Sequence, residues 1–201
     1  MEEKKSKPTL RARVNKIKDF RCKNLIAVIE NPNDLVNIGS IIRNVDALGV
    51  EKVYIVSNKK LLPKTWEEMR ASRKINAITV SAIKWSFVKI FEDTDSCINH
   101  LEKNNFTSVV TSPHIKGKNN TVLHEHDYTQ YKKLAIWFGN EVMGISNIAV
   151  NRSNLCINIP MCGIIESLNL GTSSGIVLYE ITKQRREYQF NLKKLIQAKN
   201  L

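Results

Sequence analysis

Polar side chains of ligand-binding types stand at the edges of three apolar segments in this 201-residue sequence, at 30–50, 134–146 and 157–180. They are Asn37, Arg43, Glu141, Ser167 and Asn169. The second and third segments each begin where an apolar run typical of a buried strand ends. Because ligands of parallel α/β sheets bind outside the carboxyl ends of the strands, this placement predicts a ligand site.

Taken singly, each of these residues also has a purely structural explanation. Asn37 could serve only as a helix cap or turn residue. Arg43 lies off the apolar face of its predicted helix, as a solvated arginine would. Glu141 could complement a helix N-terminus, and Ser167 and Asn169 fit ordinary capping. Only the five residues together indicate a ligand site.

The sequence gives little support for a phosphate-binding loop or a metal site. No GxGxxG follows a predicted strand and no GxxxxGK[ST] is present, and the small-residue run 171–175 lacks the spacing of a phosphate loop. The four cysteines form no CxxC pair, which favours buried free thiols over disulfides or zinc. The polar cluster 124–127 (HEHD) is interpreted as a solvated loop. We expect no metal.

Short β-branched runs alternate with stretches of helical periodicity, which favours an α/β fold with a mostly parallel sheet flanked by helices. The runs predicted as strands are 24–29, 52–56, 76–80, 107–111, 134–139 and 155–160. Helices are predicted at 38–48, with Gly49 as the stop, at 93–105 with a capping Asp or Thr, and at 167–190.

The net charge of +12 is concentrated at the two ends of the chain. Residues 1–23 hold nine Lys/Arg against three acids, and residues 183–201 hold six against one, so the 159 residues between them contribute +1. Basic ends on a nearly neutral body indicate a polyanionic partner, for which RNA, DNA and an acidic membrane surface remain open. Basic ends that serve only solubility are a further alternative.

The length favours one compact domain, and the sequence has neither a signal-peptide pattern nor an apolar run that could span a membrane. We therefore expect a cytoplasmic protein.

Three blocks of the chain, NPNDLVNIGSIIRNVDALGV, LAIWFGNEVMGIS and IPMCGIIESLNLGTSSGIVLYE, resemble in order and spacing the signature motifs of one family. This is the SpoU branch of the SPOUT RNA 2'-O-ribose methyltransferases, and the resemblance runs from about residue 24 to 186. Within it, the spacing of ENPNDLVN, the SAIKW segment (81–85) and the basic ends resemble the tRNA guanosine-18 enzymes. Gly171 stands where the family usually has a polar or small residue, and Thr172, Ser173 and Ser174 stand where alanines are common. We expect this departure to affect helix entry more than chemistry.

The resemblance implies a C-terminal deep trefoil knot at about 134–182 within a catalytic core of 24–182, flanked by basic extensions at 1–23 and 183–201, all in a single domain. It implies S-adenosylmethionine as the cofactor, with the adenosine held by backbone around Phe138, Gly139, Ile159, Met161 and Leu168. The activity implied is 2'-O-methylation of a ribose, for the tRNA subfamily a D-loop guanosine.

Roles for the polar set follow from the same resemblance. Arg43 corresponds to the family's essential arginine; a guanidinium is a poor proton acceptor, so binding of a phosphate and stabilisation of the developing alkoxide are preferred to a general-base role, which stays open. Asn37 would orient Arg43 or the ribose, and Glu141 would anchor the first motif or the RNA. Ser167 and Asn169 would shape the floor of the site.

RNA and a second copy of the chain are the partners that the resemblance implies, and no membrane is expected. The residues expected to bind RNA are Lys7, Arg11, Arg13, Lys16, Lys84, Arg185 and Arg186. Methylation of ribosomal RNA or of the tRNA wobble ribose is an alternative, as is a non-catalytic RNA-binding protein of the same fold. A knotted methyltransferase for small molecules or proteins is disfavoured by the basic ends.

Overall fold

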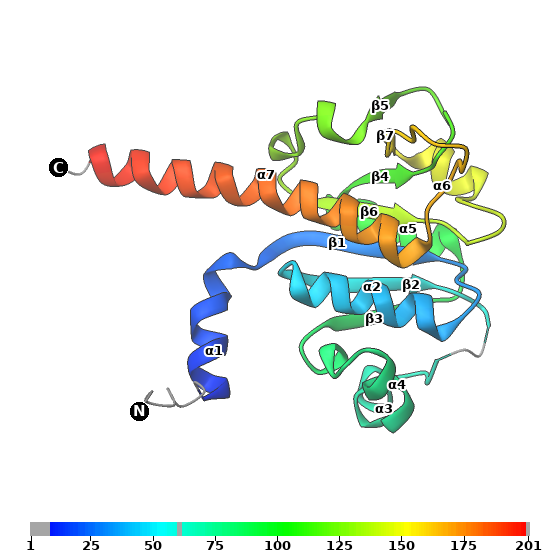
Figure 1. Cartoon of the computed structure of the whole chain (residues 1–201), viewed down its shortest axis with the longest axis horizontal. Helices are drawn as coiled ribbons and strands as arrows, with labels where there is room; N and C mark the ends of the chain where they lie inside the picture. The colour runs from blue at the N-terminus through cyan, green and yellow to red at the C-terminus, as the bar shows by residue number, and fades with distance from the viewer. Residues whose placement is uncertain (1–8, 60–61, 200–201) are drawn as a thin grey trace.

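A sheet of seven parallel strands organises the protein, in the order β3-β2-β1-β6-β4-β7-β5 (Figure 1). The computed structural model describes residues 9–59 and 62–199. The strands are β1 (Cys22–Glu30), β2 (Val50–Val56), β3 (Phe87–Phe91), β4 (Thr107–Thr111), β5 (Asn120–Val122), β6 (Leu134–Phe138) and β7 (Leu155–Asn158). The predicted parallel α/β sheet is confirmed.

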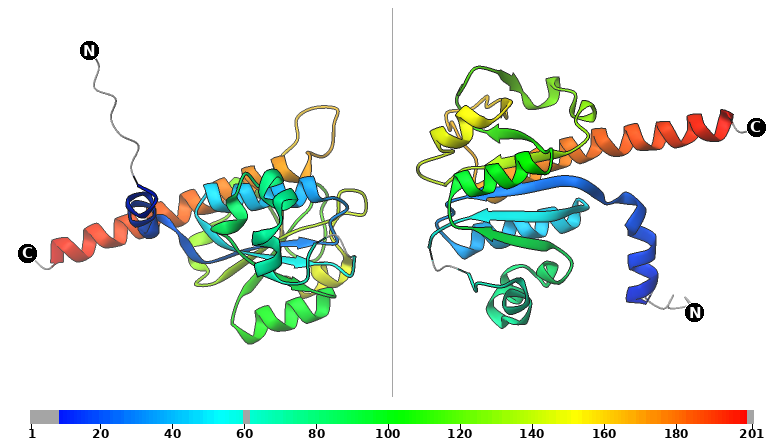
Figure 2. Two further views of the ribbon diagram at one scale, coloured as in Figure 1. Left: turned by 90° about the horizontal axis from the view of Figure 1, so that it is seen from below. Right: turned by 180° about the vertical axis from the view of Figure 1, so that it is seen from behind.

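Helices cover both faces of this sheet (Figures 1 and 2). On one face lie α2 and α7, with α3 and α4 beside α2, and on the other lie α5 and α6. The helices are α1 (Leu10–Ile17), α2 (Leu35–Ala47), α3 (Trp66–Ala71), α4 (Arg73–Ile78), α5 (Thr94–Lys103), α6 (Asn147–Arg152) and α7 (Leu170–Lys199). Short 3-10 turns are η1 (Lys18–Phe20), η2 (Ala82–Lys84), η3 (Leu123–Glu125) and η4 (Tyr128–Gln130).

The buried strand β1 shows how the apolar runs divide between the two layers. Leu25, Ala27 and Ile29 belong to the core beneath α2 and α7, whereas Ile26 and Val28 belong to the core beneath α5 and α6. All five are fully buried. Alternate side chains of a strand point to opposite faces, so a strand covered on both faces must be apolar throughout.

The prediction of a strand at 76–80 is wrong. Residues Arg73–Ile78 form α4, which Ser72 caps by accepting a hydrogen bond from the third helical N–H. The helix packs against α2 so closely that a Cβ at Gly39 would lie 2.2 Å from Cγ2 of Ile78. Packing against α2 therefore overrides the β propensity of this run. The edge strands β3 and β5 were not predicted.

The two long helices α2 and α7 are joined by polar contacts as well as apolar packing. Asn44 Nδ2 donates to the carbonyl oxygen of Gly171 at 2.7 Å and to Oγ of Ser174 at 3.0 Å. A Cβ at Gly171 would lie 2.8 Å from Cβ of Ser40. Gly171, the departure from the family pattern, thus allows α7 to begin in close contact with α2.

Both ends of the described chain leave the body of the protein. In Figure 1, α1 and the second half of α7 project on the same side, and Figure 2 shows α1 standing clear of the sheet. Helices form both of these stretches, and the helix predicted at 167–190 runs on to Lys199. Over 9–59 and 62–199, no helix is both long and apolar enough to cross a membrane.

Candidate active site

Asn37, in the first turn of α2, connects the three segments that carry the predicted site. Its Nδ2 donates to Oε1 of Glu141 at 2.7 Å and to Oδ2 of Asp34 at 3.1 Å, while its Oδ1 accepts a hydrogen bond of 3.1 Å from Nδ2 of Asn169. Asn37 is only 8% exposed. Asp34, not Asn37, caps the helix, because its Oδ1 accepts from the Asn37 backbone N–H at 2.8 Å. The structure therefore brings together three of the five predicted polar residues.

Glu141 and its neighbour Asn140 fasten the loop after β6 to the loop before α2. Oε2 of Glu141 accepts from the backbone N–H of Asn33 at 3.0 Å, and Asn33 Nδ2 donates to Oδ1 of Asn140 at 3.3 Å. The same Oδ1 accepts from the backbone N–H groups of Val142 and Met143, at 2.8 and 2.9 Å. Asn33 and Asn140 were not among the predicted site residues, although both lie within the blocks that carry the family resemblance.

A buried carboxylate holds the other end of the same loop. Glu30, the last residue of β1, is 1% exposed and accepts hydrogen bonds from Oγ and the backbone N–H of Ser146, at 2.6 and 2.8 Å. Oγ1 of Thr94 donates to it at 2.6 Å. Three donors satisfy a carboxylate that would otherwise be costly to bury. The available signal was an acid directly after the apolar run 25–29.

Gly139 is the point where the chain leaves β6 and enters this loop. A Cβ there would lie 2.3 Å from the backbone nitrogen of Ile145, so only glycine fits. The loop closes through a pair of backbone hydrogen bonds between Asn140 and Gly144, both 2.9 Å, and Gly144 has a φ of 67°. The segment 139–145 is therefore a fixed hairpin.

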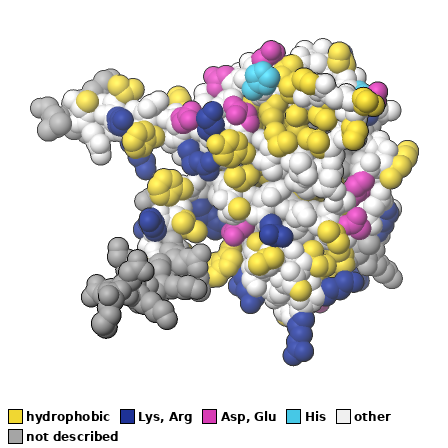
Figure 3. Space-filling view, viewed as in Figure 1, with side chains coloured by type: hydrophobic (Ala, Val, Ile, Leu, Met, Phe, Trp, Pro, Cys, Tyr) yellow, Lys and Arg dark blue, Asp and Glu magenta, His cyan; other side chains and the backbone are white. Residues whose placement is uncertain are grey.

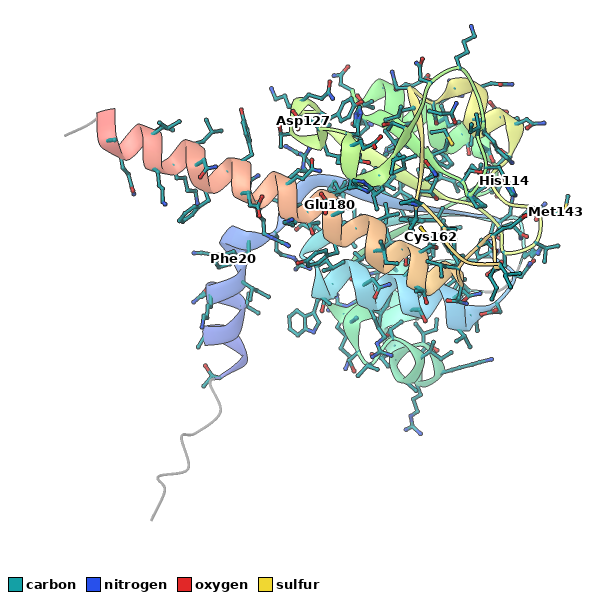
Figure 4. The ribbon with its side chains drawn as sticks, turned by 45° about the horizontal axis from the view of Figure 1, so that its top comes forward. Phe20, His114, Asp127, Met143, Cys162 and Glu180 are labelled. Carbon is teal, nitrogen blue, oxygen red and sulfur yellow. The ribbon has the colours of Figure 1, made fainter. Side chains whose placement is uncertain are left out.

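A cavity of about 500 Å³ opens at the carboxyl ends of β4, β6 and β7 and the start of α7. Of the predicted cofactor-binding residues, Gly139, Ile159, Met161 and Leu168 line it, and of the predicted polar set, Glu141, Ser167 and Asn169 do. The segment 111–116 after β4 lines it too and was not predicted. In Figure 4, His114 of this segment and Met143 of the hairpin lie at the same end of the molecule.

Three predicted residues do not line this cavity. Asn37 lies beside it, hydrogen-bonded to the lining residues Glu141 and Asn169. Phe138 is fully buried in the core beneath α2 and α7. Arg43 is exposed, on the same outer face of α2 as Val36, which is 63% exposed. On a helix, residues seven apart share a face, and the face that carries Asn37 and Asn44 toward α7 is a different one. Arg43 therefore does not enter the cavity of its own chain.

The basic residues predicted to bind RNA have different surroundings. Lys16 and Lys84 are exposed, and Arg186 is half-buried, with a hydrogen bond of 3.0 Å to the Leu48 carbonyl. Arg11 and Arg13 belong to α1, but their side chains lie outside the described part of the structure, as does all of Lys7.

Arg185, in contrast, stabilises the fold by binding backbone carbonyl groups of its own chain. It is 8% exposed and donates to the carbonyl oxygens of Tyr128, Tyr131 and Lys132, at 3.1, 2.6 and 3.4 Å. Burial lowers the pKa of its guanidinium from the ordinary value. Contact with an RNA phosphate would require these bonds to break, so we remove Arg185 from the RNA-binding set.

The predicted loop 124–127 is built from short 3-10 turns and aromatic contacts. His126 Nε2 lies 2.8 Å from the Tyr131 hydroxyl, and the two rings stack with centroids 5.6 Å apart. Gln184 of α7 donates to the His126 carbonyl at 3.2 Å. This cluster attaches the segment to α7.

Comparison with known proteins places these features in a class of enzyme. A solved structure described as the Aquifex aeolicus TrmH/SpoU tRNA modifying enzyme superimposes with a TM-score of 0.71 at 29% identity, over 90% of this chain and 86% of that one. The SpoU methyltransferase AviRb from Streptomyces viridochromogenes, solved in complex with the cofactor AdoMet, gives 0.68 at 22% identity, over 82% and 62%. The fold is that of the SpoU methyltransferases.

Sequence similarity gives the family itself. The profile of the SpoU rRNA methylase family matches residues 24–179. A tRNA (guanosine(18)-2'-O)-methyltransferase of Aquifex aeolicus is 30% identical over 176 residues, which are 87% of this chain and 76% of that protein. The chain belongs to the SpoU rRNA methylase family.

Proposed function

We propose that this protein transfers a methyl group from S-adenosylmethionine to the 2'-hydroxyl of a ribose in RNA, and that the RNA is a tRNA with its target guanosine in the D loop. The observation that carries the proposal is the hydrogen-bonded series Glu141–Asn37–Asn169 at the cavity beside the carboxyl ends of the strands. Membership of the SpoU family supports the reaction, and the relative that acts on tRNA guanosine supports the substrate. Such an enzyme would act in the cytoplasm.

The cavity suits the cofactor in size and in the way it is built. Its volume of about 500 Å³ lies within the range of about 300–1,000 Å³ of small-ligand sites. Residues of two backbone segments, 139–145 and 157–161, line it, so main-chain groups could hold an adenosine without a glycine fingerprint. When bound, S-adenosylmethionine supplies a methyl group activated by a positively charged sulfur. We propose that these segments belong to the family's trefoil knot.

The polar residues would position the ribose. Asn37 has both ends of its amide engaged, by Glu141 and Asn169, so it holds a fixed orientation. Ser167 and Asn169 line the floor of the cavity, where they would orient the 2'-hydroxyl. Arg43 would bind an adjacent phosphate and stabilise the developing alkoxide, because a guanidinium is a poor proton acceptor.

Because Arg43 faces away from its own cavity, the site would be completed by a second copy. We propose a homodimer in which Arg43 of one copy reaches the cavity of the other. An apolar surface is available for the contact: Ile164 and Ile165 of the 159–169 loop are 101% and 71% exposed, and Ile176 and Tyr179 of α7 are 40% and 55% exposed. Figure 3 shows apolar side chains gathering over the first half of α7. Exposed large apolar side chains that gather in this way favour an interaction site.

RNA would contact the basic residues that project from the body. Lys16 on α1, Lys84 on η2 and both Lys193 and Lys194 on α7 are exposed. Arg21 links the first two regions, since its guanidinium donates to the Trp85 carbonyl at 3.2 Å. We propose that these exposed cations, with Arg11 and Arg13, contact RNA phosphates.

The substrate assignment is tested by incubating the purified protein with tritiated S-adenosylmethionine and, separately, with tRNA or ribosomal RNA from a strain that lacks the gene. Label in tRNA that maps to a D-loop guanosine is the expected result. Label confined to ribosomal RNA, or to the wobble ribose, would contradict the tRNA guanosine assignment. Binding of RNA without transfer of label would favour the non-catalytic alternative.

A further inference from the structure

The acidic and basic residues that line the cavity come from different segments of the chain. Glu141 of the hairpin and Glu166 of the last loop contribute carboxylates, while Lys116, in the segment after β4, contributes an ammonium. Among the described residues that line the cavity, Lys116 is the one lysine or arginine. None of the functions assigned above uses it.

Lys116 is positioned by contacts at both its backbone and its head group. Its backbone N–H donates to Oδ1 of Asn120 at 2.8 Å, and its Nζ donates to the carbonyl oxygen of Ile145 at 3.3 Å. The turn that leads to it is closed by the His114 backbone N–H, which donates to Oγ of Ser112 at 3.1 Å. The ammonium therefore lies over the end of the hairpin that follows β6.

This ammonium has donors to spare. A lysine head group carries three N–H donors, and the carbonyl of Ile145 accepts one. Lys116 is half-buried and forms no ion pair within the described part of the chain. A partly desolvated cation on a cavity wall is stabilised by an anion that enters the cavity.

We propose that Lys116 binds the carboxylate of the methionyl group of S-adenosylmethionine. The inference rests on the proposed function, which supplies the cofactor. That carboxylate is the one anionic group of the molecule, and Glu141 and Glu166 would repel it from their part of the cavity. The same two carboxylates favour the positive sulfonium. The charge pattern thus gives the cofactor one preferred direction in the cavity.

The test compares three ligands by isothermal titration calorimetry of the full-length protein. S-adenosylmethionine carries the carboxylate, decarboxylated S-adenosylmethionine lacks only that group, and 5'-methylthioadenosine lacks the whole amino-acid part. Lys116→Met should weaken binding of S-adenosylmethionine about tenfold, as expected for loss of a charge-assisted hydrogen bond. It should leave the affinity for the neutral 5'-methylthioadenosine unchanged and should not weaken binding of decarboxylated S-adenosylmethionine, which carries only positive charges. Lys116→Arg should restore most of the loss. Lys118→Met, on an exposed neighbour outside the cavity, is the control and should behave as the wild type.

Three outcomes would overturn the inference. The first is an unchanged affinity of Lys116→Met for S-adenosylmethionine. The second is an equal loss for all three ligands, which would make Lys116 a structural residue. The third is a loss of RNA affinity alone, which would assign Lys116 to a phosphate. A wild-type protein that binds neither S-adenosylmethionine nor 5'-methylthioadenosine would contradict the proposed function as well.

Discussion

Asn37 donates a 2.7 Å hydrogen bond to Glu141, a residue 104 positions further along the chain. This contact joins the start of α2 to the hairpin after β6, and Asn169 adds the start of α7 at 3.1 Å. Three segments from distant parts of the sequence therefore meet at one amide.

Asn37→Ala removes the amide and leaves Glu141 and Asn169 without a common partner. Because Asn37 is buried, we expect a loss of about 1–3 kcal/mol in the free energy of unfolding, together with loss of most methyl transfer. Urea denaturation and a turnover assay measure the two effects. Asn151→Ala, on an exposed asparagine of α6, is the matched control. Full turnover of the Asn37 variant would refute the positioning role.

Gly139→Ala would place a Cβ 2.3 Å from the Ile145 backbone nitrogen and so distort the hairpin. We expect a loss of about 1–3 kcal/mol in stability and weaker binding of S-adenosylmethionine. Gly163→Ala is the control, because nothing lies within 4 Å of a Cβ at Gly163. If thermal unfolding and calorimetry showed no difference between the two variants, the hairpin would not form the cavity wall.

Arg43→Lys should lose most activity, because a point charge cannot reproduce the bidentate contacts of a guanidinium. Since Arg43 is exposed, its replacement should leave stability unchanged. An intersubunit site makes a further prediction for Arg43→Ala mixed in equal amounts with Asn169→Ala. Half of the dimers are then mixed and each has one intact site, so activity should return to about a quarter of the wild-type value after exchange of subunits. An inactive mixture would show that Arg43 does not act across an interface.

Replacement of Lys193 and Lys194 by glutamine tests the contribution of the end of α7 to RNA binding. If both contact phosphates, the slope of log affinity against log salt should become shallower by about one to two units. Filter binding over a range of salt concentrations measures this slope. An unchanged slope would exclude the end of α7 from the RNA-binding surface.

Acid should destabilise the protein through His126. Burial lowers the pKa of this imidazole, an effect that nearby Asp127 opposes only in part. The unfolded chain therefore binds the proton more readily, so stability is fully present above the ordinary histidine pKa of about 6.5 and falls as the pH drops below it. His126→Phe keeps the stacking on Tyr131 without titration, and denaturation midpoints across this pH range should fall less for that variant. An equal fall would exclude His126 as the cause; His100, whose pKa is lowered chiefly by burial, would then be examined.

The apolar runs predicted most of the central sheet, because a strand covered on both faces has to be apolar throughout. The prediction of a strand at 76–80 was wrong, since Ala77 and Ile78 belong to a helix that packs on Gly39 and Val80 lies exposed beyond its end. The edge strand β3 is only partly buried, so its pattern is weak. The local sequence does not show which helix will pack against an apolar run, nor how far a strand at the edge of the sheet will be covered.

The meeting of Asn37, Glu141 and Asn169 followed from the family resemblance and not from periodicity. Glu30, Asn33 and Lys116 were missed because their roles depend on the path of the hairpin after β6 and of the segment after β4. Arg185 was misplaced because a basic stretch of sequence does not reveal which of its side chains turn toward the body. The sequence also did not reveal where Arg43 acts, since we propose that it reaches the cavity of a second copy of the chain.

The most direct test of the account is mass spectrometry of the nucleosides in RNA that the protein has methylated. RNA treated with the wild-type protein and S-adenosylmethionine should yield 2'-O-methylguanosine, and RNA treated with Arg43→Ala should not. A guanosine methylated on its base would contradict the proposed reaction, as would a product that persists unchanged with the Arg43 variant.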